Sequence, residues 1–197
     1  MASFAERFPA NIEKLRTRYA EPHRAYHNWT HIDALLVHFE RLEWSSAMGV
    51  EIAVYYHDAI YDPLSGKNEA ESAELMMDDL QRKVDVATLS HANSLIIATA
   101  GHKVPADAEP GLAADCALFL DMDLSILGAS EVAFDSYDEA IRKEYAAIPD
   151  EIYLPRRRDI MAGFLARPRL FLTDTFHASH DAPARANLQR LVDRLSN

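Results

Sequence analysis

The sequence is 197 residues long, with a formal net charge of −11 at pH 7 and a pI near 5.2. Because Lys and Arg supply the attraction to nucleic acid backbones and anionic membranes, this charge argues against a general affinity for either. Apolar residues make up 49% and charged residues 26% of the sequence, as in an ordinary globular protein with a sizeable core.

Two further features bear on the compartment of the protein. Cys116 is the only cysteine, so the fold cannot depend on an intramolecular disulfide or on an oxidising environment. The stretch MASFAERFPANIEKLRTRYA carries Glu6 and no long apolar segment, and no part of the sequence approaches the about 18 apolar residues of a membrane span. We therefore expect a cytoplasmic protein that has no membrane partner.

The spacing of apolar residues by three and four, together with only 6 glycines, predicts helices nearly throughout and no confident strand. We expect an all-α fold, a single-domain helical bundle over 1–197. The predicted helices, in chain order, cover 10–20, 29–43, 47–60, 67–84, 87–100, 113–127, 130–147, 155–166 and 182–195.

Some helix ends have a chemical signature. Gly128 follows DLSIL, where a left-handed cap would fit, and Ser130 would then cap the next helix. Asp181 precedes APARANLQRLVDRL with Pro183 in the first turn, which predicts a helix start there. The basic run PRRRD at 155–159 is either a solvated helix start or an anion-binding surface.

Several histidines and carboxylates occupy positions that fit either a metal-binding role or an ordinary structural role. The stretch RAYHNWTHIDALL places His27 and His31 four residues apart at the start of a predicted helix, so both could approach one ion from one helix face. His57 and Asp58 follow a long apolar run, and adjacent residues can share an ion only at its edge or near a helix end. A hydrogen-bonded core histidine beside a capping aspartate is the structural alternative.

Later in the chain, DCALFLDMDLSILG places two carboxylates, Asp121 and Asp123, in a strongly apolar segment where each needs a partner. They point to different helix faces, so at most one is expected to bind a metal and the other to hold an Arg or a helix end. His102 ends the apolar helix before it, and either the helix dipole or a phosphate or second-metal role accounts for it.

Taken in order, His31, His57 with Asp58, and a later aspartate form the pattern H…HD…D, which resembles that of the HD-domain metal-dependent phosphohydrolases. YHNWTHI is similar to the YHN-containing motif of the cyclic-nucleotide phosphodiesterases in the same superfamily. The resemblance implies that His31, His57 and Asp58 are metal ligands and that His27 is the general acid. MDLS resembles the ADLS segment of those enzymes, which favours Asp123 over Asp121 as the last ligand.

Over about residues 15–190, the sequence looks most like a group of small bacterial predicted HD phosphohydrolases. The motifs that carry this likeness are YHNWTHI, YYHDAIYDP, NEAESA, TAGH, DMDLSILG and IRKEY. The resemblance implies a metal-site core over about 24–128 and C-terminal helices over about 130–196. The likeness to the cyclic-nucleotide phosphodiesterases is confined to short motifs, so a cyclic nucleotide is a minor expectation.

The ligand set so implied, two imidazoles and two carboxylates, suits Mn, Fe, Co, Ni or Zn, with Mg as a further candidate. Such an ion would lower the pKa of bound water for in-line attack on a phosphate ester, and His27 would protonate the leaving alcohol. Glu69 is either a water-orienting carboxylate or a helix N-terminal Glu favoured by the dipole. His102, Lys103 and Arg142 are candidate phosphate contacts.

We therefore expect a metal-dependent phosphohydrolase whose partner is a small phosphorylated molecule, for example a nucleotide, and not a nucleic acid polymer. Two alternatives stay open, a non-catalytic nucleotide or metabolite sensor that keeps the metal site, and a di-iron HD-type oxygenase. The second would need more histidine ligands than His102 clearly supplies. The oligomeric state also stays open, with a homodimer as one option.

Overall fold

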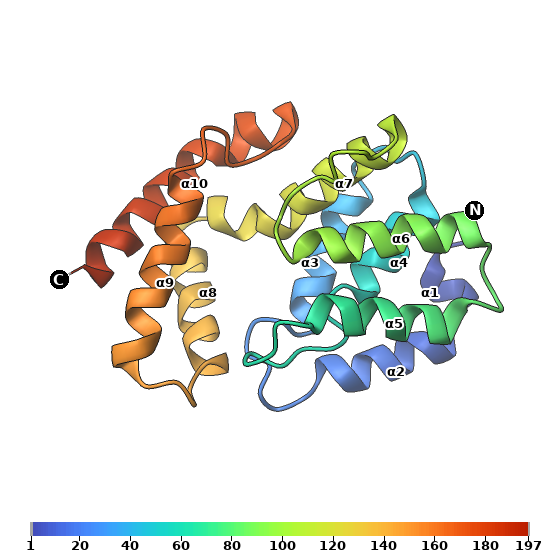
Figure 1. Cartoon of the computed structure of the whole chain (residues 1–197), viewed down its shortest axis with the longest axis horizontal. Helices are drawn as coiled ribbons and strands as arrows, with labels where there is room; N and C mark the ends of the chain where they lie inside the picture. Colours follow the sequence, from blue (N-terminus) through green and yellow to red (C-terminus); the bar gives the residue numbers. More distant parts are fainter. Residues whose placement is uncertain (1, 197) are drawn as a thin grey trace. The chain divides into compact units, whose positions relative to one another are not determined.

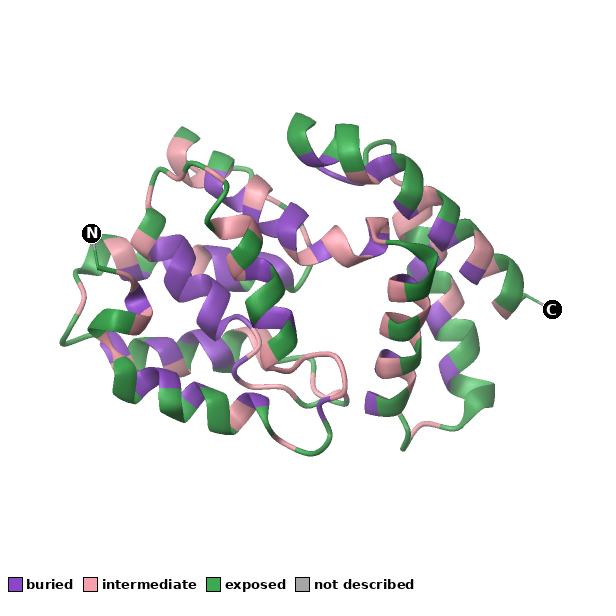
Figure 2. Ribbon diagram, turned by 180° about the vertical axis from the view of Figure 1, so that it is seen from behind, coloured by how far each residue is buried: buried purple, intermediate pink, exposed green. Residues whose placement is uncertain are grey.

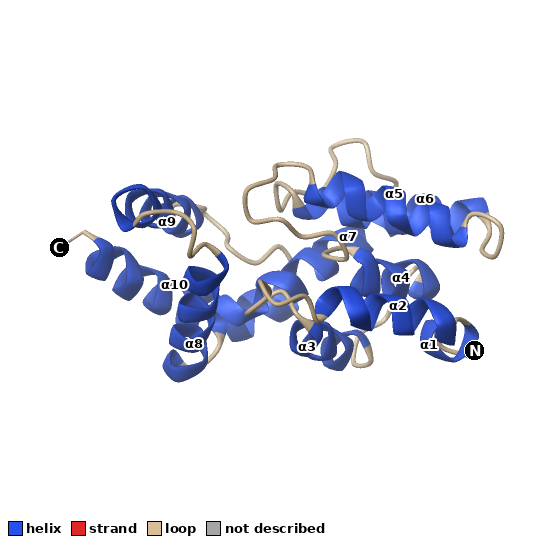
Figure 3. Ribbon diagram, turned by 90° about the horizontal axis from the view of Figure 1, so that it is seen from below, coloured by secondary structure: helices blue, strands red, loops and turns tan. Residues whose placement is uncertain are grey.

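A computed structural model describes residues 2–196 and is helical with no strand in that range, which confirms the all-α prediction (Figures 1 and 3). The helices are α1 (Phe4–Arg7), α2 (Pro9–Tyr19), α3 (Trp29–Phe39), α4 (Ala47–Tyr56), α5 (Asn68–Leu80), α6 (Val86–Thr99), α7 (Pro110–Asp123), the 3-10 helix η1 (Leu124–Gly128), α8 (Glu131–Glu144), α9 (Asp150–Leu165) and α10 (Asp174–Leu195). None of the helices within residues 2–196 combines the length and apolarity needed to cross a bilayer.

Two predicted helix starts are wrong. α9 begins at Asp150 rather than at 155, and α10 begins at Asp174 rather than at 182, so Pro155 and Pro183 both lie inside helices. Proline lacks the N–H of an interior helix bond and is therefore expected at a first turn. Here α9 and α10 continue through their prolines and pack against each other.

Gly128 also differs from its prediction, because no glycine among residues 2–196 has a positive φ. Glycine is needed at position 128 because His180 lies so close. A Cβ at Gly128 would lie 2.7 Å from the Cβ and 2.8 Å from the carbonyl oxygen of His180. The glycine therefore permits close approach of η1 to α10. Ser130 does cap α8 as predicted, with its hydroxyl accepting from the N–H of Ala133.

The described chain divides into two compact units, Met1–Leu120 and Asp121–Asn197, with the division inside α7. The expectation of one domain over 1–197 stays a prediction. In the first unit, α4 is buried on nearly every side and packs against α1, α3, α5 and α6 (Figure 2). A helix that is apolar all round belongs in a core, and AMGVEIAVYY has that composition.

A buried polar network holds α4 against its neighbours at Tyr56. The Tyr56 hydroxyl accepts from the side-chain amide of Asn11 at 3.0 Å and donates to Asp79 at 3.1 Å. Burial is the main reason that the pKa of Tyr56 is raised, so the phenol stays neutral at physiological pH. The network fixes the axial position of the helix that leads into the HD pair.

The second unit is built from η1, α8, α9 and α10 around buried apolar side chains, among them Leu127, Phe134, Met161, Leu188 and Leu191. Within it, Asp138 accepts from Arg157 at 3.0 Å and from Arg194 at 2.6 Å. Within the basic run, the charge of Arg157 is therefore buried and paired, whereas Arg156 is exposed.

Candidate metal centre

His57 and Asp58 lie where α4 ends. His57 is the C-cap and keeps helical dihedrals, and its N–H donates to the carbonyl of Ala53 at 2.9 Å. Asp58 belongs to the turn that follows. Adjacent residues on a regular helix diverge by about 100°, so the helix end is what lets both side chains reach one point, as the sequence predicts.

His31 reaches the same point from the first turn of α3. That turn is fixed by Asn28, the N-cap, whose side-chain oxygen accepts from the N–H of Thr30 at 2.9 Å. Asn28 also provides the carbonyl that accepts from the N–H of His31 at 3.1 Å. Both His31 and His57 are buried, at 6% and 1% exposure.

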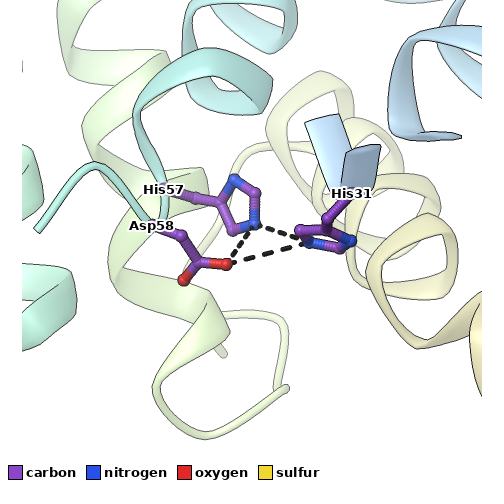
Figure 4. A group of neighbouring side chains, drawn as sticks. All are labelled: His31, His57 and Asp58. Carbon is purple, nitrogen blue, oxygen red and sulfur yellow. Dashed lines mark hydrogen bonds and ion pairs between the residues drawn. The ribbon is translucent and has the colours of Figure 1, made fainter. Parts of the chain in front are cut away.

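The three side chains converge (Figure 4). His31 Nε2 lies 3.2 Å from His57 Nε2 and 3.8 Å from Asp58 Oδ2, and His57 Nε2 lies 3.0 Å from the same carboxylate oxygen. Ligands held by one ion at 2.0–2.2 Å are about 3.0 to 3.6 Å from one another in octahedral or tetrahedral geometry. Two of the three separations, 3.2 and 3.0 Å, fall in this range and the third, at 3.8 Å, is slightly longer, so the group could hold an ion.

The ring of His57 is oriented by its other nitrogen. Nδ1 lies 3.0 Å from the carbonyl of Val54, which can only accept a proton, so Nδ1 carries the N–H. In the neutral ring, the lone pair is then on Nε2, which faces His31 Nε2 and the Asp58 carboxylate. Metal-binding histidines usually donate their second nitrogen to a carbonyl or carboxylate in this way.

The electrostatics of Asp58 agree with a site for positive charge. Burial raises the pKa of this carboxyl, but attraction to the protonated forms of His57 and His27, the hydrogen bond with His57 and a smaller attraction to His31 outweigh burial. The pKa of Asp58 is therefore lowered well below its usual range, and the carboxylate stays ionised. A nearly buried carboxylate beside two imidazoles is a donor set that suits a divalent transition metal.

His27 lies in the bend before α3, not on the helix, so the pair with His31 does not form a helical four-residue spacing. The two rings are still near each other, with centroids 6.2 Å apart and ring planes at 78°. The ring of Tyr61 lies 4.3 Å from that of His27. His27 thus lies beside the cluster without being one of its three members.

The two aspartates of α7 are placed differently. Asp121 accepts from the N–H groups of Leu172 and Thr173 and from the Thr173 hydroxyl, each at 2.7 Å. Thr173 is the N-cap of α10, so the interpretation that Asp121 holds a helix end is confirmed. Asp123 is the last residue of α7 and belongs to the second unit, and its role as a fourth ligand stays a prediction.

The remaining predicted site residues, Glu69, His102, Lys103 and Arg142, lie outside the three-residue cluster. Glu69 is half-buried in the first turn of α5. His102 follows α6 with a left-handed φ of 47°, and Lys103 beside it is exposed. Arg142 donates to Asp150 and to the carbonyls of Tyr145 and Ile148, which ties the end of α8 to the start of α9. None of them belongs to the three-residue cluster, and their roles toward substrate stay predictions.

The residues that hold the segment after α4 (57–62, called the HD turn below) in place could not be recognised from the sequence. Arg24, before α3, donates to the carbonyls of Asp58 and Ala59. From α5, the Ser72 hydroxyl accepts from the N–H of Ile60 at 3.0 Å and lies 3.3 Å from its carbonyl. The Asn68 amide pairs with the backbone of Asp62 in the same manner.

The only available signal for two of these residues was the NEAESA motif itself. Asn68 and Ser72 are four residues apart on α5 and therefore share the face that meets the turn. Arg24 has no such signal, because its partners are backbone carbonyls, which any residue can provide.

Comparison with protein-family models, with curated proteins and with solved structures finds no match to this chain. The candidate centre therefore rests on the residues themselves. It consists of two buried imidazoles and one carboxylate from α3 and from the end of α4, arranged so that they could hold a metal ion.

Proposed function

We propose that this protein is a metal-dependent phosphohydrolase that acts on a small phosphate ester. The observation that carries the proposal is the convergence of His31 Nε2, His57 Nε2 and Asp58 Oδ2 within 3.0–3.8 Å. The order of these residues and the motifs around them resemble those of HD-domain phosphohydrolases, a family that we propose for this chain. Asp123 is the proposed fourth ligand.

In this proposal, each residue has a distinct task. A divalent ion held by His31, His57 and Asp58 would supply Lewis acidity toward a phosphoryl oxygen and would lower the pKa of water bound to it. His57 offers Nε2 because the Val54 carbonyl holds its other nitrogen as N–H. Asp58 supplies the negative charge that balances the ion, and His27, close enough for its charge to act on Asp58, donates the proton to the leaving oxygen.

The first test is elemental analysis of the purified protein, followed by a phosphate-release screen over nucleotides and sugar phosphates with Mn²⁺, Fe²⁺, Co²⁺, Ni²⁺, Zn²⁺ or Mg²⁺ added. We expect a bound transition metal and release of phosphate from a subset of these compounds. Tight binding of a ligand with no turnover under any metal would favour a sensor. Metal-dependent oxygen consumption would instead favour an oxygenase.

His57→Ala and Asp58→Ala should each remove bound metal and phosphatase activity together, because each deletes one of three converging donors. The matched control is His91→Ala, since His91 also lies beside a buried carboxylate, 2.9 Å from Asp115, but outside the cluster. The control should keep metal and activity. Full activity of a metal-free Asp58→Ala protein would refute the mechanism.

His27→Ala should keep its metal but lower kcat by about 10²- to 10⁴-fold, the usual contribution of a general acid. Because p-nitrophenolate leaves without protonation, the loss should be much smaller with p-nitrophenyl phosphate than with an alkyl phosphate. Comparison of kcat for both substrates measures this difference. An equal loss on both substrates would argue against the acid role, and loss of metal would make His27 a ligand.

A further inference from the structure

Arg24 is a buried charge in a segment without regular structure. It lies between the end of α2 at Tyr19 and the start of α3 at Trp29, and its side chain is 0% exposed. Burial of a guanidinium is unfavourable unless its N–H groups find partners. The partners of Arg24 therefore indicate what its burial achieves.

The guanidinium joins two separate parts of the candidate centre. Its Nη1 donates to the carbonyl of His27 at 3.0 Å and to that of Asp58 at 2.7 Å, and Nη2 donates to the carbonyl of Ala59 at 3.1 Å. Its Nε donates to Glu21 at 2.9 Å, which balances the charge. Four of its five N–H groups can be satisfied in this way.

Two aromatic rings flank the same guanidinium. Its central carbon lies 5.1 Å from the ring centroid of Tyr19 and 5.4 Å from that of Tyr61. The ring of Tyr61 also lies against the ring of His27. The position of Arg24 is thus fixed by cation–π contacts, and through Tyr61 it is linked to the His27 side chain as well as to its backbone.

From these contacts we propose that Arg24 is the positioning residue of the metal centre, holding the turn of Asp58 and the bend of His27 at a fixed distance from each other. This inference rests on the metal site of the proposed function. The carbonyls of Asp58 and Ala59 lie just past the C-terminal end of α4, where the helix dipole also favours a cation. A planar fork can bind several carbonyls at once, whereas a lysine ammonium donates from a single point.

The test uses Co²⁺ as the probe, because its visible absorption reports both affinity and coordination geometry. The full-length protein, Arg24→Ala, Arg24→Lys and the control Arg16→Ala are titrated with Co²⁺ after removal of other metals. Arg16 is a suitable control because its guanidinium lies 4.0 Å over the ring of Trp29 at the start of the same helix α3, without reaching the backbone of the HD turn.

We expect Arg24→Ala to bind Co²⁺ about 10- to 100-fold more weakly with an altered spectrum, as is usual when a group that orients metal ligands is lost. Arg24→Lys should lie between this variant and the wild type, and Arg16→Ala should match the wild type. Free guanidinium ion, added below its denaturing range with equal ionic strength in all samples, should restore affinity to Arg24→Ala alone. Should Arg24→Ala not fold, Arg24→Lys and guanidinium rescue during refolding provide the same comparison.

The outcomes separate this inference from the function itself. Wild-type affinity and spectrum in folded Arg24→Ala, or an equal loss in Arg16→Ala, would overturn the role of Arg24. Lack of guanidinium rescue would also count against it. If the wild type binds Co²⁺ tightly but hydrolyses no phosphate ester, the phosphohydrolase proposal fails while the role of Arg24 is still decided by the titration. If the wild type binds no Co²⁺, the metal centre and both proposals fail together.

Discussion

Among single residues, the hydrogen bonds of Asp121 distinguish its role from that of a metal ligand. Asp121 is buried, and all three of its described hydrogen bonds come from Leu172 and Thr173 at the start of α10. Burial raises the pKa of Asp121, although the Thr173 hydroxyl and the two N–H groups act in the opposite direction. A carboxylate whose oxygens already accept these bonds has little capacity left for a metal.

Asp121→Ala should therefore lower the free energy of unfolding, by about 2–4 kcal/mol, because it leaves buried donors without their charged acceptor. It should leave the metal content unchanged. Asp123→Ala should do the reverse, with a loss of metal affinity and a smaller effect on stability. Urea unfolding curves and elemental analysis of both variants provide the comparison. Metal loss from folded Asp121→Ala would transfer the ligand role to Asp121.

At the scale of elements, the sequence predicted α2 to α6 closely but misplaced the starts of α9 and α10. The first group has local signals, namely apolar spacing within each helix and Asn28 or Asp85 at an N-cap. The start of α10 depends on Asp121, 52 residues before Thr173, and no local pattern encodes such a contact. The same holds for the site, since the ligand types are visible in HD and in YHNWTHI but the contacts of Arg24 are not.

The stabilisation that Asp181 gives to α10 should depend on pH. Burial raises the pKa of this carboxyl, but the bonds from Arg185 and from the N–H of Leu170 outweigh burial, so the pKa is lowered overall. Because the native pKa lies below the unfolded value, the stabilisation is present above the unfolded pKa and is lost as the pH falls through the native pKa. The unfolded pKa of an aspartate is about 3.9.

We expect Asp181→Asn to be less stable than the wild type at pH 7, by about 1–2 kcal/mol, and to lose less stability on acidification from about pH 5 to pH 2. Urea unfolding at several pH values measures both effects. Asp159→Asn is the control, because its carboxylate pairs with Arg158 at the surface and such pairs contribute little. Parallel pH curves for Asp181→Asn and the wild type would contradict this assignment.

At the scale of the whole chain, the candidate centre assembles segments that are far apart in the sequence. His31 comes from α3, His57 and Asp58 from the end of α4, and the turn after them is held from α5 by Ser72. In the unfolded chain these donors do not share one point, so an ion that they hold binds the native state preferentially. Such binding stabilises the fold by mass action.

A free metal concentration of 100 times Kd should therefore raise the free energy of unfolding by about 2.7 kcal/mol, which is about 5–11 °C in Tm for a chain of this size. Differential scanning calorimetry with Zn²⁺ or Co²⁺, and again with excess chelator, measures the shift. His27→Ala should keep it, since His27 lies outside the cluster, whereas His57→Ala and Asp58→Ala should lose it. A shift of equal size in Asp58→Ala would mean that the ion binds elsewhere, and the candidate centre would then not be the metal site of this protein.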